Sequence, residues 1–373
     1  MNQETNQSQS QENEEIIVSE ELLRNPHKFI CDYVESLYPK IGMKTFQVLA
    51  LMPGSLILPD LYFGSKKVRS NIHALFLAPS GSGKTSIADL FANLTFTPLK
   101  FESVTPAKME SAIEKNPVFS LIVGDFARMS RDPILIKVIE GLLGEEKSIN
   151  RKTMRKDMDI DADGIALLCG VSTDLSHYIL SGLIFRVVPI LCSHSHNEHS
   201  EIGDHIKNKI GNHGNDHTED MIKKYYMDLA KIQTDEKKQV RGYHIPKSFR
   251  DESYEEWDKL TKPLVKELGL NFFRELQEFF RFLCASAFLN YHNRNVENNI
   301  LYPNEDDFRI ALRLMKNAII FKKRIIKSEI FAKGIKDAKQ FKEIMNSEKI
   351  PDSYKDIIRN LVEVKGAKVS IKK

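Results

Sequence analysis

Short apolar runs alternate with helical patterns in the middle of the chain, between positions 69 and 193. The runs HALFLA, VFSLIVGD, IALLCGV and IFRVVPIL each have the length of one buried strand, and the stretches between them have helical spacing of apolar residues. Strands that alternate with helices are typical of a parallel sheet covered by helices. The pattern therefore predicts an α/β fold for residues 69–193.

The amino-terminal part of the chain shows two different patterns. Residues 1–19 begin with MNQETNQSQSQENEE, which is rich in Gln, Asn, Ser and Glu and lacks apolar periodicity. Such a segment buries too little apolar surface to offset its ordering entropy, so we predict a disordered polar tail. Residues 20–68 have helical spacing that is broken at Pro39 and Pro53, which predicts a helical segment leading into the core.

Three further segments follow the α/β core. Residues 194–220 are rich in His, Asn and Gly without periodicity, which predicts a His-rich loop insertion. The chain then becomes helical, with FFRELQEFFRFLCASAFLNYH as its clearest amphipathic segment. We predict a helical domain over 221–325 and a basic helical tail over 326–373.

A glycine-rich loop lies between the first apolar run and the helical pattern KTSIADLFANL. Its glycines allow backbone N–H groups to turn inward around an anion, and the start of the helix adds partial positive charge. In this context we predict an ATP phosphate-binding loop, in which Lys84 reaches the β- and γ-phosphates and Thr85 offers its hydroxyl to Mg²⁺. The predicted nucleotide-binding residues are Ala78, Pro79, Ser80, Gly81, Ser82, Gly83, Lys84, Thr85 and Ser86.

An acidic residue ends the second apolar run. Asp125 follows VFSLIVG, so we expect it at the carboxyl end of a strand, where a carboxylate can hold Mg²⁺ or orient a water molecule. No guanine-reading NKxD sequence follows, which argues against a GTPase. We therefore predict that Asp125 is both catalytic and a metal ligand.

Composition excludes several other classes of protein. The 54 Lys and Arg residues nearly balance the 51 Asp and Glu residues, so total charge does not by itself point to a polyanionic partner, and the local distribution of charge must decide. The four cysteines include no CxxC pair, which argues against a disulfide scaffold. No apolar run approaches the ~18 residues of a membrane span, and the amino terminus lacks a signal-peptide pattern. We expect a soluble cytoplasmic protein with no membrane partner.

The order of these motifs resembles the ATPase core of the minichromosome maintenance helicases, a branch of the AAA+ family, and phage and plasmid replication ATPases of the primase/helicase-like kind. The resemblance spans about residues 70–320 and includes GEEKSINRKTMRKDMDIDADGIALLCGVST, GLIFRVV and RELQEFFRFLCASAFLNYHNRN. It implies a P-loop NTPase with an AAA+-like parallel sheet core. It also implies that residues 221–325 form a C-terminal helical lid domain, and that copies of the chain assemble into a homo-oligomeric ring.

The same resemblance implies further catalytic residues. The polar sensor after the third apolar run would be Ser172 or Thr173. The arginine that stabilises charge on a neighbouring subunit's γ-phosphate would be Arg186. The lid arginine would be Arg274, with Arg281 one heptad later on the same helical face. A plain amphipathic lid helix, without a sensing role for Arg274, is an open alternative.

The acidic motif departs from the family pattern. The family has adjacent Asp and Glu, for the metal and the water respectively, whereas this chain has Gly124, Asp125 and Phe126. Aligning GDFARM with the family's DEFDKM puts Asp125 at the water-activating position and Gly124 at the metal position. The strand-end argument instead favours the metal role for Asp125. From sequence alone both assignments stay open. A third alternative is that one carboxylate both holds the metal and activates the water.

A basic stretch lies between the acidic strand and the sensor strand. Its sequence, KSINRKTMRKDMDIDADG, resembles the hairpin that such helicases direct at the nucleic-acid backbone. Lys and Arg at that place would make salt-sensitive phosphate contacts with single-stranded or double-stranded DNA. A solvated loop is the alternative. The predicted nucleic-acid-binding residues are Lys147, Arg151, Lys152, Arg155 and Lys156.

The histidine-rich loop is a weaker candidate for a metal site. Cys192, His194, His196 and His199 offer zinc-type ligands, but their spacing matches no compact zinc template and no second ligand pair is evident. We therefore interpret this segment as a flexible, weakly metal-binding insertion.

Together these features predict an ATP-hydrolysing, Mg²⁺-dependent AAA+-type motor or helicase-like ATPase that acts on DNA in replication or remodelling. Two rivals stay open. One is a nucleotide-dependent initiator or scaffold that binds DNA and scarcely hydrolyses ATP. The other is a P-loop kinase that phosphorylates a small molecule and needs no arginine from a neighbouring subunit.

Overall fold

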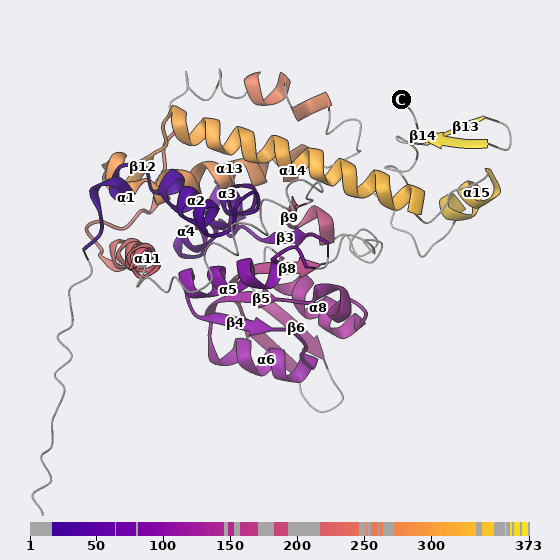
Figure 1. Cartoon of the computed structure of the whole chain (residues 1–373), viewed down its shortest axis with the longest axis horizontal. Coiled ribbons are helices and arrows are strands. Elements are labelled where there is room, and N and C mark those ends of the chain that lie inside the picture. Colours follow the sequence, from indigo (N-terminus) through magenta and orange to yellow (C-terminus); the bar gives the residue numbers. More distant parts are fainter. Residues whose placement is uncertain are drawn as a thin grey trace, which may run out of the picture.

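The centre of the molecule is a five-stranded sheet in which all strands run parallel. The structure, a computed structural model, describes residues 17–63, 65–79, 81–144, 148–152, 157–170, 183–192, 217–245, 272–332 and 338–346, with shorter stretches within 251–263 and 355–371. The strand order is β4-β5-β8-β3-β9, and helices flank the sheet (Figure 1). The α/β fold that the sequence predicts for residues 69–193 is therefore confirmed.

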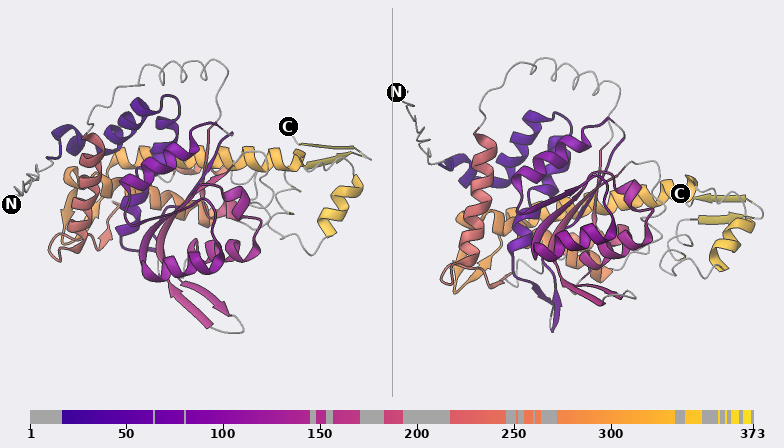
Figure 2. Two further views of the ribbon diagram at one scale, coloured as in Figure 1. Left: turned by 60° about the horizontal axis from the view of Figure 1, so that its bottom comes forward. Right: turned by 90° about the horizontal axis from the view of Figure 1, so that it is seen from below.

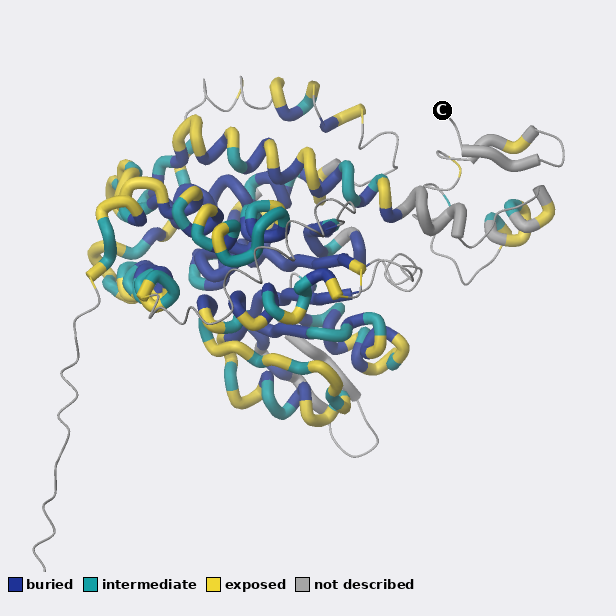
Figure 3. Tube along the Cα trace, in the orientation of Figure 1, coloured by how far each residue is buried: buried dark blue, intermediate teal, exposed yellow. Residues whose placement is uncertain are grey.

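Four of the five strands coincide with the four apolar runs in the sequence. The strands β3, β5 and β8 are buried over nearly their whole length (Figure 3), as expected for central strands of a sheet with both faces covered. The core elements are β3 (Ala74–Leu77), α5 (Lys84–Leu94), β4 (Pro98–Phe101), α6 (Pro106–Lys115), β5 (Val118–Val123), α7 (Phe126–Met129), α8 (Pro133–Leu142), β6 (Ser148–Lys152), β7 (Asp157–Asp161), β8 (Asp163–Gly170), η1 (Leu183–Phe185) and β9 (Val188–Leu191).

The fifth strand, β4, is not predicted by the apolar pattern. It has four residues, alternates between exposed and half-buried positions, and lies at the edge of the sheet. Its first residue is Pro98, which is tolerated there because an edge strand need not donate every N–H to a neighbour. A short, half-exposed strand of this kind gives no continuous apolar run, so the sequence pattern misses it.

The amino-terminal segment covers the core sheet. Its elements are α1 (Glu20–Arg24), α2 (Pro26–Leu37), α3 (Gly42–Leu49), α4 (Met52–Ile57), β1 (Leu61–Phe63) and β2 (Lys66–Val68). Helix α3 contacts β3 and β9, and α4 contacts β5 and β8. The predicted helical character of 20–68 therefore extends to Ile57, and an antiparallel β1–β2 pair follows it.

The carboxyl-terminal part is mainly helical. Its elements are α11 (Thr218–Thr234), β10 (Gly242–Tyr243), α13 (Phe272–Leu289), η2 (Tyr291–Asn293), β11 (Asn295–Glu297), β12 (Ile300–Tyr302) and α14 (Glu305–Ala332). The long helix α14 runs along one side of the molecule, contacts β9, and continues past position 325, where the sequence predicts a boundary (Figure 1). No helix in the described part of the chain is long and apolar enough to span a membrane.

The prediction of an all-helical tail over 326–373 is wrong for its last part. Helix α15 (Ala338–Asn346) is followed by an antiparallel pair, β13 (Val362–Lys365) and β14 (Lys368–Ile371). The register pairs Lys365 with Lys368 and leaves two residues between the strands. The sequence VEVKGAKVSI alternates valine with polar residues on both sides of a glycine, which favours a hairpin over a helix.

A buried ion pair joins α13 to α14. The Lys322 ammonium donates to both carboxylate oxygens of Glu275 at 3.0 Å, and both side chains are only 1% exposed. Burial raises the pKa of the neighbouring Glu278, and the positive charge of Lys322 opposes that shift. One ammonium therefore compensates charge at the junction of the two longest helices of the carboxyl-terminal part.

Replacement of Lys322 by Met should destabilise the protein by about 3–5 kcal/mol, because it leaves the Glu275 carboxylate buried without a partner. The free energy of unfolding, measured by chemical denaturation, tests this. The double variant Glu275→Leu with Lys322→Met should recover most of the loss, and Lys28→Met, which removes an exposed ion pair with Asp32, should change little. A single Lys322→Met variant with wild-type stability would contradict the role of this pair.

Candidate functional site

The glycine-rich loop connects the carboxyl end of β3 to the start of α5. Gly81 and Gly83 have φ angles of 77° and 81°, in the left-handed region that favours glycine. The Ser82 hydroxyl donates to the backbone oxygen of Pro79 at 2.6 Å, which closes the loop on itself. The backbone conformation therefore requires glycine at the two positions that the sequence predicts. Ser80 lies outside the described residues.

Lys84 is folded over this loop. Its ammonium donates to the backbone oxygens of Ala78 and Pro79 at 2.9 and 2.6 Å. Partial burial lowers the pKa of Lys84, and the negative charge of Asp125 is among the influences that oppose this shift. Because the ammonium is held only by loop carbonyls, a phosphate group entering the loop can replace them. Thr85, the next residue, is exposed on the first turn of α5.

Asp125 lies level with the end of β3, two strands away. The parallel register pairs Val123 with Leu168, so Asp125 is level with Gly170, which itself pairs with Leu77 at the end of β3. The carboxylate of Asp125 also accepts a hydrogen bond of 3.2 Å from the backbone N–H of Arg128 and caps α7. The predicted strand-end position is therefore observed, on the same edge of the sheet as Lys84.

A second carboxylate, which the sequence analysis misses, lies beside Asp125. Glu102 directly follows β4, and the register pairs Phe101 with Val123, so Glu102 comes next to Gly124. The backbone N–H of Gly124 donates to the oxygen of Phe101 at 2.9 Å. A β-carbon at position 124 would collide with both carboxylate oxygens of Glu102, so a larger residue there would have to displace this carboxylate.

Glu102 is held by one neighbouring cation. The Lys100 ammonium lies 3.7 Å from its Oε1 atom and also pairs with Asp89 of α5. The side chain of Glu102 remains 57% exposed, so its carboxylate is accessible at the carboxyl edge of the sheet. The one sequence feature that could have pointed to Glu102 is Gly124, because the family resemblance implies an acidic residue at that position.

The segment before α3 contacts the loop from the amino-terminal side. Both carboxylate oxygens of Glu35 accept backbone hydrogen bonds, from Lys40 at 2.7 Å and Met43 at 2.6 Å. This fixes the turn that carries Ile41, whose Cδ1 would lie 3.4 Å from a β-carbon at Gly83. The amino-terminal helices therefore form one wall of the glycine-rich loop.

Arg186 lies at the amino ends of the strands, whereas Lys84 lies at their carboxyl ends. It precedes β9 by two residues, and Val188 donates a 2.7 Å backbone hydrogen bond to His73, the residue before β3. The guanidinium of Arg186 donates to the backbone oxygen of Glu140 at 3.0 Å. The structure therefore does not bring Arg186 to the glycine-rich loop of its own chain.

Arg274 is also remote from the loop. It lies on the first turns of α13, where the Lys66 ammonium is 5.1 Å from the ring centre of the adjacent Phe273. Arg281, one heptad later, donates to the backbone oxygen of Arg69, before the start of β3, at 2.8 Å. These contacts place the start of α13 beside β2 and the Arg281 side chain near the amino ends of the strands.

Arg69, whose backbone oxygen accepts the bond from Arg281, is itself buried at the amino ends of the strands. The Arg69 side chain is 3% exposed and donates to the backbone oxygens of Leu142 and Gly144 at 2.7 and 2.9 Å. It also contacts the Asp163 carboxylate, at the start of β8, at 3.3 Å. Arg281 therefore belongs to a buried network that ties α13 and α8 to the sheet.

The predicted basic stretch coincides with an antiparallel pair. Strands β6 and β7 pair Ser148 with Asp161 and Lys152 with Asp157, and they project from the body of the molecule (Figure 2). Only the backbone of Arg151 and Lys152 is described. The other predicted residues Lys147, Arg155 and Lys156 and the predicted sensors Ser172 and Thr173 lie outside the described residues.

Metal ligation by the histidine-rich segment stays a prediction, because residues 193–216 are outside the described part of the chain. Among the residues that the structure does describe, no group of three or more His, Cys, Asp or Glu side chains could hold a metal ion.

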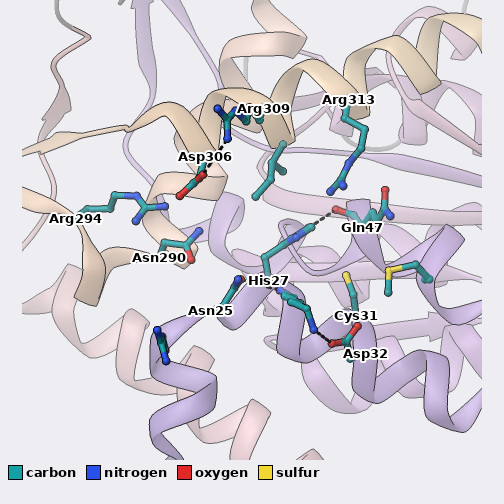
Figure 4. Close-up of a pocket in the computed structure, with 14 residues that line it drawn as sticks. Asn25, His27, Cys31, Asp32, Gln47, Asn290, Arg294, Asp306, Arg309 and Arg313 are labelled. Atoms are coloured by element: carbon teal, nitrogen blue, oxygen red, sulfur yellow. Dashed lines mark hydrogen bonds and ion pairs between the residues drawn. The ribbon is translucent and has the colours of Figure 1, made fainter.

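A cavity of about 500 Å³ lies away from the glycine-rich loop, between α2, α3 and the start of α14 (Figure 4). His27 at its wall donates to the backbone oxygen of Gln47 at 2.9 Å, and burial lowers the pKa of this histidine. Arg294 is held by the buried Asp307 carboxylate through bonds of 2.6 and 2.9 Å. None of the predicted nucleotide-binding residues lines this cavity.

Comparison with known proteins gives no relative from which a function could be transferred, because neither a family model nor a curated protein matches this chain.

Proposed function

We propose that this chain is an AAA+-like P-loop ATPase that binds ATP with Mg²⁺ and hydrolyses it. The observation that supports this best is the position of Asp125, level with the end of the strand that leads into the glycine-rich loop. Parallel sheets bind ligands at the carboxyl ends of their strands, where loops and helix amino termini converge. Here that edge carries a cationic lysine in a glycine loop and a carboxylate facing it across one strand.

The chain's own residues divide the task of nucleotide binding. The backbone around Gly81 and Gly83 and the start of α5 would hold the phosphates, and Lys84 would exchange its loop carbonyls for phosphate oxygens. The hydroxyl of Thr85 and the carboxylate of Asp125 are the hard oxygen donors that Mg²⁺ prefers, so these residues fit the metal. When bound, Mg²⁺ supplies neutralisation of charge on the phosphates.

Two rivals differ from this proposal in measurable ways. A nucleotide-dependent scaffold would bind ATP at the same loop with negligible turnover. A small-molecule kinase would transfer the phosphoryl group to an acceptor and would show little ATP consumption without one. ATP turnover by the purified chain alone, stimulated by DNA, favours the motor over both.

Replacement of Lys84 by Ala should weaken ATP binding by about 10–100-fold, the loss expected for removing a charge-assisted hydrogen bond. Asp125→Asn should keep ATP affinity within about threefold yet lower turnover by about 100-fold, because the carboxylate would position the Mg²⁺ that stabilises charge during hydrolysis. Equilibrium ATP binding and phosphate release measure the two effects.

The matched control is Lys108→Ala, which removes an exposed lysine on α6 and should leave both quantities unchanged. ATP affinity unchanged in a folded Lys84→Ala variant would reject the phosphate-binding loop. Wild-type turnover in Asp125→Asn would reject the catalytic assignment of that carboxylate.

The proposal extends to an assembly that acts on DNA. Arg186 lies at the amino edge of the sheet, so it could complete only the site of a neighbouring copy. The β6–β7 pair leads into the start of β8 and therefore leaves the sheet at that same edge. A ring of copies would then present the basic strand pair to a nucleic-acid backbone, while the nucleotide lies at the opposite edge.

Conversion of Arg151, Lys152, Arg155 and Lys156 to Ala should reduce the salt dependence of DNA binding. The slope of log affinity against log salt should fall by roughly one for each phosphate contact removed, because each contact releases about one counterion. The variant should also lose DNA stimulation of ATP turnover and keep basal turnover.

A matched control removes four exposed lysines that lie elsewhere, Lys108, Lys115, Lys237 and Lys316. This control has the same change in net charge and should keep most of the wild-type slope. Binding of DNA by the hairpin variant with wild-type affinity and slope would show that the basic stretch is a solvated loop.

A further inference from the structure

The proposed ATPase site has one unexplained feature, the glycine beside its carboxylate. The family resemblance implies an acidic pair on a single strand, and this chain has Gly124 in one of the two places. In the structure that place is not open, because the Glu102 carboxylate occupies the position where a side chain on residue 124 would begin. The acid that one strand lacks is therefore supplied by its neighbour.

The backbone fixes this arrangement. Strands β4 and β5 are parallel neighbours (Figure 1). They pair Phe101 with Val123, and the 2.9 Å bond from Gly124 N–H to the oxygen of Phe101 continues the pairing beyond the last strand residue. Glu102 and Asp125 therefore leave two adjacent strands at the same edge. The spacing of strands, about 4.8 Å, puts such residues within reach of one bound phosphate group.

The environment of Glu102 suits a reacting group better than a structural one. Its side chain is 57% exposed, so it adds little to the core. The contact with Lys100 at 3.7 Å is longer than a hydrogen bond, and Lys100 also binds Asp89. The glycine at position 124 leaves this exposed carboxylate in place beside Asp125, where any side chain on residue 124 would displace it.

We propose that Glu102 is the carboxylate that orients and deprotonates the attacking water, and that Asp125 is the carboxylate on the metal side. This rests on the proposed ATPase function. Asp125 takes the metal side because β5, which it follows, lies two strands from β3 and its phosphate-binding loop, whereas β4, which Glu102 follows, lies three strands away.

The reaction balances without another reactant. The oxygen of water forms a bond to the γ-phosphorus, and the bond from that phosphorus to the β,γ-bridging oxygen breaks, so the electron pair leaves with ADP. The proton of the water passes to the Glu102 carboxylate and from there to solvent. The products are ADP and inorganic phosphate.

The test uses the full chain with Glu102→Gln, Glu102→Asp and Gly124→Ala. Glu102→Gln should lower kcat by about 100-fold and keep ATP affinity within about threefold, because amides do not accept the proton. Glu102→Asp should retain part of the activity and the acid limb of the pH–rate profile, which Glu102→Gln should lose. Gly124→Ala keeps the carboxylate but displaces it from its position beside Asp125, so kcat should fall there too.

The matched control is Asp89→Asn, which removes the other partner of Lys100 and should leave kcat within about threefold, since Asp89 does not contact the reacting water. If wild-type and Asp89→Asn chains hydrolyse ATP, Asp125→Asn does not, and Glu102→Gln retains full kcat, the role of Glu102 is overturned and the ATPase proposal stands. If the wild-type chain binds no ATP, both are overturned.

Discussion

Parallel pairing of β3, β8, β5 and β4 is the constraint on which the candidate site depends. The registers hold the strand ends nearly level, so residues that follow β3, β5 and β4 emerge at one edge. These residues are far apart in the sequence, and only the sheet brings the glycine-rich loop, Asp125 and Glu102 together. The apolar residues of these strands are buried in the core, and their burial fixes the position of the polar side chains that follow each strand.

The two edges of the sheet have different roles in this account. The carboxyl edge holds exposed or half-buried polar groups that can accept a ligand. The amino edge is tied together by Arg69, whose buried guanidinium satisfies backbone oxygens at the end of α8 and contacts Asp163 of β8. This buried guanidinium links α8, β8 and the segment before β3, because it donates to acceptors on more than one of them. Arg186 and the β6–β7 pair lie at these same amino ends of the strands.

Sequence reasoning recovers the features that depend on local patterns. Four strands follow from apolar runs, and the left-handed backbone at Gly81 and Gly83 follows from the need for glycine in a tight anion-binding loop. Glu102 does not follow, because its strand is short and half-exposed and its partner Gly124 is 22 residues away in sequence. Its role emerges only when the register between β4 and β5 is known.

The same limit applies to the carboxyl-terminal half. Helical periodicity predicts α13, but it cannot tell which edge of the sheet the helix reaches, so the positions of Arg274 and Arg281 depend on tertiary contacts. In the tail, alternating valines around a glycine form the β13–β14 pair, where the sequence analysis predicts that the helical pattern continues. Apolar residues that alternate with polar ones have the period of a strand, so this short stretch does not continue the helical pattern before it.

The most direct test of the central claim is a calorimetric titration of the wild-type chain with ATP, ADP and AMP in the presence of Mg²⁺. If the loop after β3 holds the β- and γ-phosphates, affinity should follow phosphate number, with ATP and ADP binding and AMP binding weakly or not at all. AMP binding as tight as ATP binding, or no binding of any of the three, would contradict the account.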